Sequence, residues 1–311
     1  MKTIKKPFVN NNQAQADSIF RVSILDGLGV FLFFVLVIAI GLVVTGCAST
    51  SDSRPRTAQD FLKLGNQFSD SGDYDKAIAD YNEALRLKSD YADAYYNRAL
   101  AYYGLGDIDR AIADYGETIR VDGNYVNAYY NRARAYSEAG DLEKSIADYT
   151  VVIRLDNDVW AHLGRGFAYF RMGDNDKAIE NYNEAIRQYP NEAEAYRYRG
   201  YAYNRIGDPD RAIADYNEAV RLNSDYGDAY FNLGTVYYHK GDLDQAIASF
   251  TQVVRIDPND HEAYSFRGTA YLDSGDIDRA IADFEMALRL VPDNDVYREE
   301  LEETLQKRSE L

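Results

Sequence analysis

The sequence predicts an all-α protein: an α-solenoid of seven helix–turn–helix repeats with a C-terminal capping helix, preceded by an apolar N-terminal segment. Two observations lead to this class. The dipeptide Gly-Asp occurs at seven regular places, with its glycines 34, 34, 33, 34, 34 and 34 residues apart. Each half-repeat also places apolar residues at helical spacing, as at Ala111, Ile112, Tyr115 and Ile119.

The Gly-Asp dipeptide is expected at the turn between the two helices of each repeat. Glycine adopts a positive φ without strain and therefore ends the first helix. The aspartate places negative charge at the start of the second helix, where the helix dipole favours it. Pro209 lies early in its second helix, where a missing N–H costs little. The repeats are therefore expected within residues 58–294, at 58–91, 92–125, 126–158, 159–192, 193–226, 227–260 and 261–294.

Small residues at two positions of each repeat let the paired helices approach closely. Position 8 carries Gly65, Ala99, Ala133, Gly166, Gly200, Gly234 and Gly268. Position 20 carries Ala77, Ala111, Ser145, Ala178, Ala212, Ala246 and Ala280. With aromatic residues at positions 11 and 24, this pattern resembles the tetratricopeptide repeat (TPR) family across residues 58–294. The resemblance implies a right-handed solenoid.

The resemblance also implies a binding surface. In this family the first helices of successive repeats line a concave groove that takes extended peptides or partner helices. Position 6 carries Asn97, Asn131 and Asn232, and relatives use such asparagines to bind a peptide backbone, since an amide both donates and accepts. Gly164 and Tyr198 interrupt this ladder. Aromatic residues accompany it, and they either contact a ligand or pack on the adjacent hairpin: Tyr96, Tyr103, Tyr130, Tyr198, Tyr201, Phe231 and Tyr238.

Arginine occupies position 7 in five repeats, where the family usually has leucine: Arg98, Arg132, Arg165, Arg199 and Arg267. These side chains form either a basic stripe for an acidic partner or an internal ladder with position 23. That position carries Asp114, Asp148, Asn181, Asp215 and Asp283. Repeat six lacks both members, with Leu233 and Ser249, and this joint loss favours the internal ladder.

The third repeat is one residue short, between Leu155 and Trp160. We expect this deletion to alter the stacking of the next hairpin. It marks either an irregular site formed by Trp160, His162, Phe167 and Phe170, or a tolerated change in a loop.

Residues 295–311 predict one further helix, the capping helix. Asp295 is its expected N-cap, and Val296, Tyr297, Leu301 and Leu305 are expected to form its apolar stripe. The opposite face carries Glu and Lys, as the terminal cap of a solenoid requires.

Catalysis is not predicted. His162, His239 and His261 lie in three different repeats, without the spacing of zinc ligands, and we find no nucleophile elbow, phosphate-binding glycine loop or HExxH motif. We expect no metal and no cofactor. The chain has a net charge of −17, and since its first 46 residues carry +2, the remainder carries −19. Such a body repels phosphate, which argues against nucleic acid as a partner.

The N-terminal segment contains an uncharged run of 17 residues, 28–44, followed shortly by the only cysteine, Cys47. The sequence VTGC, which ends at this cysteine, resembles a bacterial lipoprotein signal. The resemblance implies cleavage before Cys47 and lipidation of its thiol. Residues 1–46 are then a signal peptide, and residues 47–57 are a flexible polar tether.

A retained transmembrane helix is the alternative for the same run. It exceeds the 7–15 apolar residues of a usual signal peptide, and it is at the short limit of what spans a bilayer. Basic residues precede the run and are expected to stay in the cytoplasm. Both alternatives therefore place residues 48–311 outside the cytoplasm.

Together these features predict a non-catalytic scaffold or adaptor on the outer side of a bacterial membrane, in the periplasm or at the cell surface. Its expected partners are proteins or peptides bound in the groove, and its expected process is cell-envelope assembly. An enzyme or enzyme subunit that acts on the cell wall is the alternative, as is a single-span membrane protein with the same repeats. Homo-oligomerisation stays open.

Overall fold

The computed structural model describes residues 55–310, which contain fifteen α-helices and no strand. All of these helices lie within the unit Pro55–Leu311. The apolar run and Cys47, on which the anchor prediction depends, lie outside the described residues. Within residues 55–310, no helix has both the length and the apolar character of a membrane span.

The helices form seven hairpins followed by one terminal helix, which confirms the predicted all-α fold of consecutive helix pairs. The first helices of the repeats are α2 (Ala58–Asp70), α4 (Ala92–Gly104), α6 (Val126–Ala139), α8 (Val159–Met172), α10 (Ala193–Arg205), α12 (Gly227–Lys240) and α14 (His261–Asp273). The second helices are α3 (Tyr74–Leu87), α5 (Ile108–Val121), α7 (Leu142–Asp156), α9 (Asn175–Gln188), α11 (Pro209–Leu222), α13 (Leu243–Ile256) and α15 (Ile277–Leu290). The terminal helix is α16 (Asp295–Ser309).

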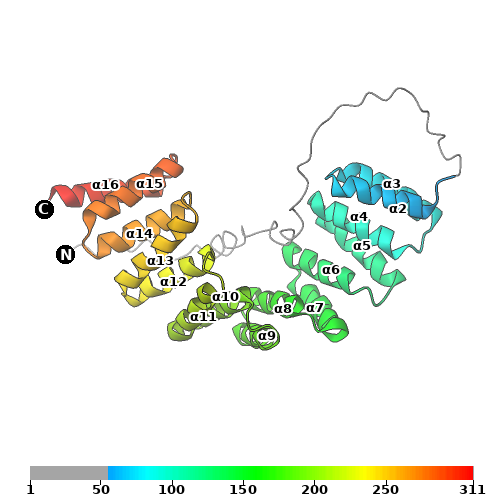
Figure 1. The fold of residues 1–311 in the computed structure, drawn as a ribbon, viewed down its shortest axis with the longest axis horizontal. Coiled ribbons are helices and arrows are strands. Elements are labelled where there is room, and N and C mark those ends of the chain that lie inside the picture. Colours follow the sequence, from blue (N-terminus) through cyan, green and yellow to red (C-terminus); the bar gives the residue numbers. More distant parts are fainter. Residues whose placement is uncertain (1–54, 311) are drawn as a thin grey trace, which may run out of the picture. The chain divides into compact units, whose positions relative to one another are not determined.

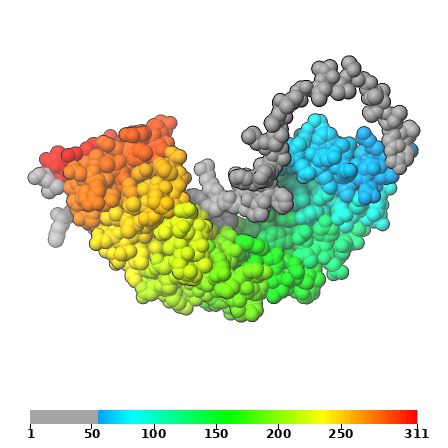
Figure 2. Space-filling view, in the orientation of Figure 1, coloured from blue at the N-terminus to red at the C-terminus, as the bar shows by residue number. Residues whose placement is uncertain are grey.

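Within this unit each hairpin packs on the next one along the chain (Figure 1), so the sequence colours follow one another in bands (Figure 2). First helices of neighbouring repeats also contact one another, as α6 contacts α8 and α8 contacts α10. Second helices of neighbouring repeats make no contact of this extent among the described residues. The first helices therefore line the inner side of the array. We call the surface formed by repeat positions 2, 5, 6, 9, 12 and 13 of these helices the first-helix face.

The turns inside the hairpins have the predicted geometry. The seven turn glycines have φ between +77° and +86°. The aspartate after each glycine caps the second helix; Asp107, for example, accepts a hydrogen bond from the backbone N–H of Arg110 at 3.1 Å. Pro209 is the first residue of α11, as expected. At the terminal helix the predicted cap is wrong by one residue: Asn294 caps α16, and Asp295 is its first helical residue.

The core lies between the two helices of each hairpin. The aromatic ring at position 24 is almost fully buried, as for Tyr216, against the small residue at position 8 of the same repeat. A Cβ atom added at Gly200 would lie 2.9 Å from Cε1 of Tyr216, so only glycine fits this close approach. In repeat two, Tyr115 and Tyr102 are buried, and Tyr95 is half-buried.

The apolar stripe of α16 differs from the prediction. Val296 is 60% exposed and Leu305 is 43% exposed, whereas Tyr297 and Thr304 are buried and Leu301 is half-buried. Spacings of four and three residues place Tyr297, Leu301 and Thr304 on one side of the helix. Val296 and Leu305 each lie one residue outside that series, which turns them toward solvent.

Candidate peptide-binding face

The arginines of position 7 form an internal ladder, as predicted. Four of the five make two hydrogen bonds of 2.6–2.9 Å, through Nε and Nη2, to the position-23 carboxylate of their own repeat. The pairs are Arg98–Asp114, Arg132–Asp148, Arg199–Asp215 and Arg267–Asp283. The arginine side chains are only 14–20% exposed and those of the aspartates 8%. These guanidinium groups therefore bind within the fold and do not form a basic stripe for a partner.

Repeat four carries a weaker version of this pair. Arg165 donates from Nε to Oδ1 of Asn181 at 2.8 Å and from Nη1 to the hydroxyl of Thr150 at 3.1 Å. Burial lowers the pKa of Arg165, and no carboxylate offsets it. Burial also lowers the pKa of Arg98, but its hydrogen bonds to Asp114 and the charge of that carboxylate, with smaller contributions from Tyr102 and Tyr95, together outweigh this effect, and the net pKa is raised.

The three predicted ladder asparagines lie half-buried on the first-helix face. Asn97 donates from Nδ2 to Oδ1 of Asn66 at 2.9 Å, and Asn131 donates from Nδ2 to the hydroxyl of Tyr96 at 2.9 Å. Each of these two amides therefore donates one N–H to a side chain of the preceding repeat. The carbonyl oxygen and the second N–H remain for a partner. Asn232 lies at the same repeat position on α12.

The interruption of the asparagine ladder has a packing cause. A Cβ atom at Gly164 would lie 2.3 Å from Cζ of the buried Tyr149, so no side chain fits at this position. In the next repeat, Tyr198 stacks on Tyr182 with ring centroids 5.7 Å apart and donates from its hydroxyl to Glu194 at 2.8 Å. Both positions serve the contact between neighbouring repeats.

The predicted aromatic residues of the face are all half-buried. Each of several rings contacts the position-24 ring of a hairpin, as in the pairs Tyr96–Tyr115 at 6.0 Å, Tyr130–Tyr149 at 5.6 Å and Phe231–Phe250 at 5.5 Å between centroids. These rings thus pack between helices with one side and keep part of their surface exposed on the first-helix face.

Tyr103 and Tyr238 occupy equivalent positions in repeats two and six and make equivalent contacts. The hydroxyl of Tyr103 donates to Glu138 at 2.6 Å, and that of Tyr238 donates to Asp273 at 2.6 Å. Burial, with the neighbouring carboxylate, raises the pKa of each phenol to about 12. Both phenols are therefore donors at neutral pH and join adjacent first helices.

The linker of the short repeat contains only Asn157 and Asp158, between α7 and α8. Asn157 has a φ of 48°, which makes it the non-glycine residue with positive φ in the described range. Asp158 caps α8 by accepting a hydrogen bond from the N–H of Trp160 at 2.8 Å. The other inter-repeat linkers contain four residues, and α7 has 15 residues where the other second helices have 14, so the repeat is one residue short in total.

The four residues of the predicted irregular site have different environments along α8. Trp160 is 43% exposed, whereas His162 is buried, with Nε2 3.3 Å from Oδ1 of Asn157. Phe167 and Phe170 contact the rings of Tyr198 and Tyr201 on α10, at 6.3 and 5.1 Å between centroids. An irregular site there stays a prediction, with Trp160 as its exposed member.

Arg197 is a buried charge that the sequence analysis missed. Its residue is 3% exposed, and its Nε donates to the hydroxyl of Tyr226 at 2.5 Å. Glu194 and Asp228 lie 3.9 and 4.0 Å from its guanidinium nitrogens. The sequence contains a signal for this residue. Position 5 carries leucine or an aromatic ring in the first four repeats, and arginine occurs there only in repeat five.

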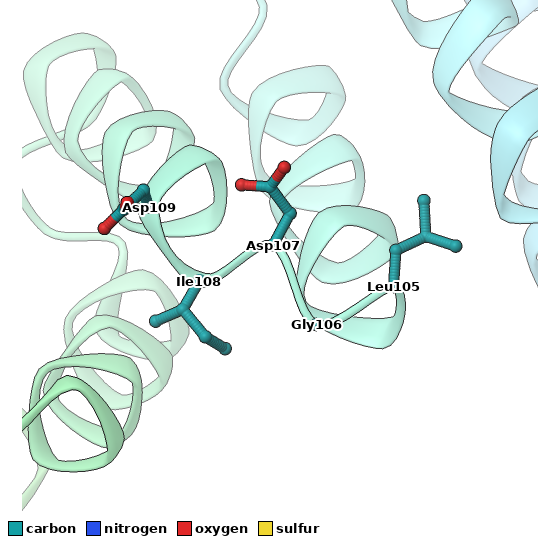
Figure 3. A pocket seen from close by; sticks show the side chains of 5 residues that line it. All are labelled: Leu105, Gly106, Asp107, Ile108 and Asp109. Atoms are coloured by element: carbon teal, nitrogen blue, oxygen red, sulfur yellow. The ribbon is translucent and has the colours of Figure 1, made fainter.

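A shallow hollow lies at the turn between α4 and α5, lined by Leu105, Gly106, Asp107, Ile108 and Asp109 (Figure 3). Asp107 already binds the N–H and side chain of Arg110, so this hollow is part of the hairpin turn. No cluster of three or more metal-ligating side chains occurs in the part of the chain that the structure describes.

The chain is similar in structure to solved repeat proteins. A tetratricopeptide repeat protein from Parabacteroides merdae is 19% identical with a TM-score of 0.62, over 80% of this chain and 98% of the other. The C-terminal part of a TPR repeat-containing protein from Cytophaga hutchinsonii is 17% identical with a TM-score of 0.62, over 77% and 99%. The MamA protein is 32% identical over 54% of this chain and 92% of the other, with a TM-score of 0.49. No curated protein sequence matches the chain.

Sequence models of the family match most of the repeat region. A model described as TPR repeat matches residues 65–106. A model described as tetratricopeptide repeat matches residues 96–159, 163–227, 205–261 and 231–295, which together exceed half of the chain. With the seven stacked hairpins, these matches show that the chain belongs to the tetratricopeptide repeat family.

Proposed function

We propose that the protein is a non-catalytic adaptor that binds protein or peptide partners along its first-helix face. Tetratricopeptide repeat proteins are generally non-catalytic scaffolds, and the fold supports a role in protein interaction. The observation that carries the proposal is the composition of this face. Half-buried aromatic rings offer apolar area at low entropic cost, and the amides of Asn97 and Asn131 keep donors and acceptors for a peptide backbone.

The proposal includes a membrane anchor at the N-terminus. The support is the sequence alone: an apolar run at 28–44, then small residues before Cys47, then a polar tether. In this proposal the repeats work outside the cytoplasm of a bacterium, in the periplasm or at the cell surface, in assembly of the cell envelope. Several acyl chains on Cys47 would hold the protein firmly, because each buried CH₂ contributes roughly 0.8 kcal/mol.

Cross-linking and pull-down of the full chain tests the binding face. The test variant is Asn97→Ala, Asn131→Ala, Asn232→Ala, and it is expected to lose partners that the wild type captures. The matched control is Asn124→Ala, Asn191→Ala, Asn217→Ala, which removes three exposed asparagines that lie outside the first helices. Equal partner lists for the wild type and the test variant would contradict the proposal.

Mass spectrometry of the mature N-terminus tests the anchor. We expect the chain to begin at an acylated Cys47, and Cys47→Ser to keep the apolar run attached. An intact Met1 in the membrane fraction would instead indicate a retained transmembrane helix.

A further inference from the structure

We propose that the first-helix face of α6, α8 and α10 binds an acidic segment of a partner protein, an inference that rests on the proposed adaptor function. Arg134, Arg171 and Arg205 carry it, one on each of these helices and all of them exposed. None of the three forms a salt bridge within residues 55–310. The ladder arginines, in contrast, are each paired with an aspartate, except Arg165.

Hydrogen bonds hold two of the three arginines against the preceding first helix, so that the three form a row. Nη1 of Arg171 donates to the backbone oxygen of Ser137 on α6 at 2.6 Å, and Ser137 lies one turn after Arg134. Nη1 of Arg205 donates to the backbone oxygen of Phe170 on α8 at 3.0 Å. A guanidinium group has five N–H donors, so these bonds fix the heads of Arg171 and Arg205 and leave donors for carboxylates.

Each guanidinium group also lies over an aromatic ring. The distance from Cζ to the ring centroid is 5.7 Å for Arg134 over Tyr103 and 5.9 Å for Arg171 over Phe167. Arg205 lies 4.4 Å from the centroid of Phe170. Apolar surface on one side lowers the hydration of these charges, which strengthens a charge-assisted hydrogen bond to a carboxylate. Arginine beside aromatic rings is also the typical composition of an interface hot spot.

The surroundings of the row are acidic, which limits the partner that fits. Position 13 is acidic in repeats one, three and seven, with Asp70, Glu138 and Asp273. The first turns of other first helices are acidic at Asp93, Asp228 and Glu262, and α10 itself carries Glu194 in its first turn. A short acidic segment confined to the three arginines is therefore attracted, while a longer one reaches these carboxylates and is repelled. The chain's own tether does not match, because residues 48–57 carry two arginines and one aspartate.

Fluorescence anisotropy with the full chain tests this inference. The probe is a short labelled peptide of Glu, Phe and Ser, and its counterpart has Lys in place of Glu. We expect the Glu peptide to bind, to weaken as salt screens the charges, and to bind about tenfold more weakly to Arg134→Gln, Arg171→Gln, Arg205→Gln. We expect no binding of the Lys peptide.

The matched control removes the same charge from the second helices, with Arg120→Gln, Arg154→Gln, Arg221→Gln in the last turns of α5, α7 and α11. It should bind the Glu peptide within about twofold of the wild type. Circular dichroism of both triple variants checks that the helices are intact. Equal weakening in the two variants would show an effect of net charge alone and overturn the inference.

Further experiments distinguish an acidic peptide from other occupants of this face. Binding of a single-stranded oligonucleotide in preference to the Glu peptide would replace the acidic peptide with nucleic acid and overturn the inference. Light scattering could instead show self-association that the Arg134, Arg171, Arg205 variant loses. The face would then bind a second copy of the chain, and the inference would be wrong. If the Glu peptide fails to bind while the asparagine variant still loses captured partners, the adaptor proposal stands and this inference fails.

Discussion

Repeats two and four share the geometry of their hairpins but differ in two features. One is the side-chain pair that joins the two helices, and the other is the linker to the preceding repeat. In repeat two, Arg98 forms a bidentate bridge with the carboxylate of Asp114. In repeat four, the same positions hold Arg165 and Asn181, joined by one hydrogen bond. A four-residue linker precedes repeat two, whereas a two-residue linker precedes repeat four.

The difference teaches how the array tolerates a deletion. The short linker holds α8 close to α7, and the ring of Tyr149 then occupies the space in which repeat two carries the side chain of Asn97. Gly164 resolves this overlap by having no side chain. The missing side chain at residue 164 thus accommodates the ring of Tyr149, and the stacking continues on both sides of the short linker.

The largest expected effect comes from giving Gly164 a side chain. Gly164→Ala places a Cβ atom 2.3 Å from Cζ of the buried Tyr149, and overpacking of this kind costs about 3 kcal/mol. The measurement is hydrogen exchange of α8 in the full chain, because repeat arrays open locally.

Gly116→Ala is the matched control for this change. Gly116 lies inside α5, and a Cβ atom there meets only Nη1 of Arg132 at 3.6 Å, an ordinary contact. Alanine should stabilise α5 by about 0.5–1 kcal/mol through helix propensity. If both variants changed the stability in the same direction, the close approach of Tyr149 would not explain why residue 164 is glycine.

A smaller effect is expected when repeat two is given the pair of repeat four. Asp114→Asn leaves the largely buried Arg98 with a neutral partner and should destabilise the hairpin of α4 and α5 by about 2 kcal/mol. Glu117→Gln on the same helix is the control. It removes the partner of the exposed Arg120, a pair worth about 0–1 kcal/mol. Denaturant unfolding and exchange of α5 report the difference, and equal costs would contradict a structural role for the ladder.

The converse change gives repeat four the pair of repeat two. Asn181→Asp offers Arg165 a carboxylate at the position where its neighbours have one, and should stabilise the hairpin of α8 and α9 by about 1 kcal/mol. Asn217→Asp on α11 adds the same charge on an exposed side chain and should have little effect on α8 and α9. A loss of stability in Asn181→Asp would show that the ladder geometry does not extend to repeat four.

The repeat period explains what could be predicted from the sequence. Helix positions, turn glycines and capping aspartates recur seven times and the ladder partners five times, so the repeat pattern predicted them. Features that occur once were missed or misplaced. The cap at Asn294 and the buried Arg197 depend on local backbone and on a neighbouring repeat, and Gly164 is explained only by the ring of Tyr149. The row of arginines on the first-helix face also required the contacts between neighbouring helices.

The smallest expected effect is a pH dependence confined to repeat four. His162 is buried, and its Nδ1 has no hydrogen-bond partner among the described residues. Burial lowers the pKa of His162, and the charge of Arg165 lowers it further. Glu184, Asn181 and Asp158 face it with the opposite influence.

The sign follows from proton linkage. Because the folded pKa of His162 lies below the unfolded value of about 6.5, the unfolded state binds more protons in between. Stability is therefore full above pH of about 6.5 and falls as the pH drops from there toward the lowered pKa. Hydrogen exchange of α8 and α9 should accelerate over that range, and His162→Gln should flatten the dependence. His239→Gln, an exposed histidine of α12 outside this hairpin, should leave it as in the wild type. An unchanged slope in His162→Gln would assign the pH dependence to the carboxylates instead.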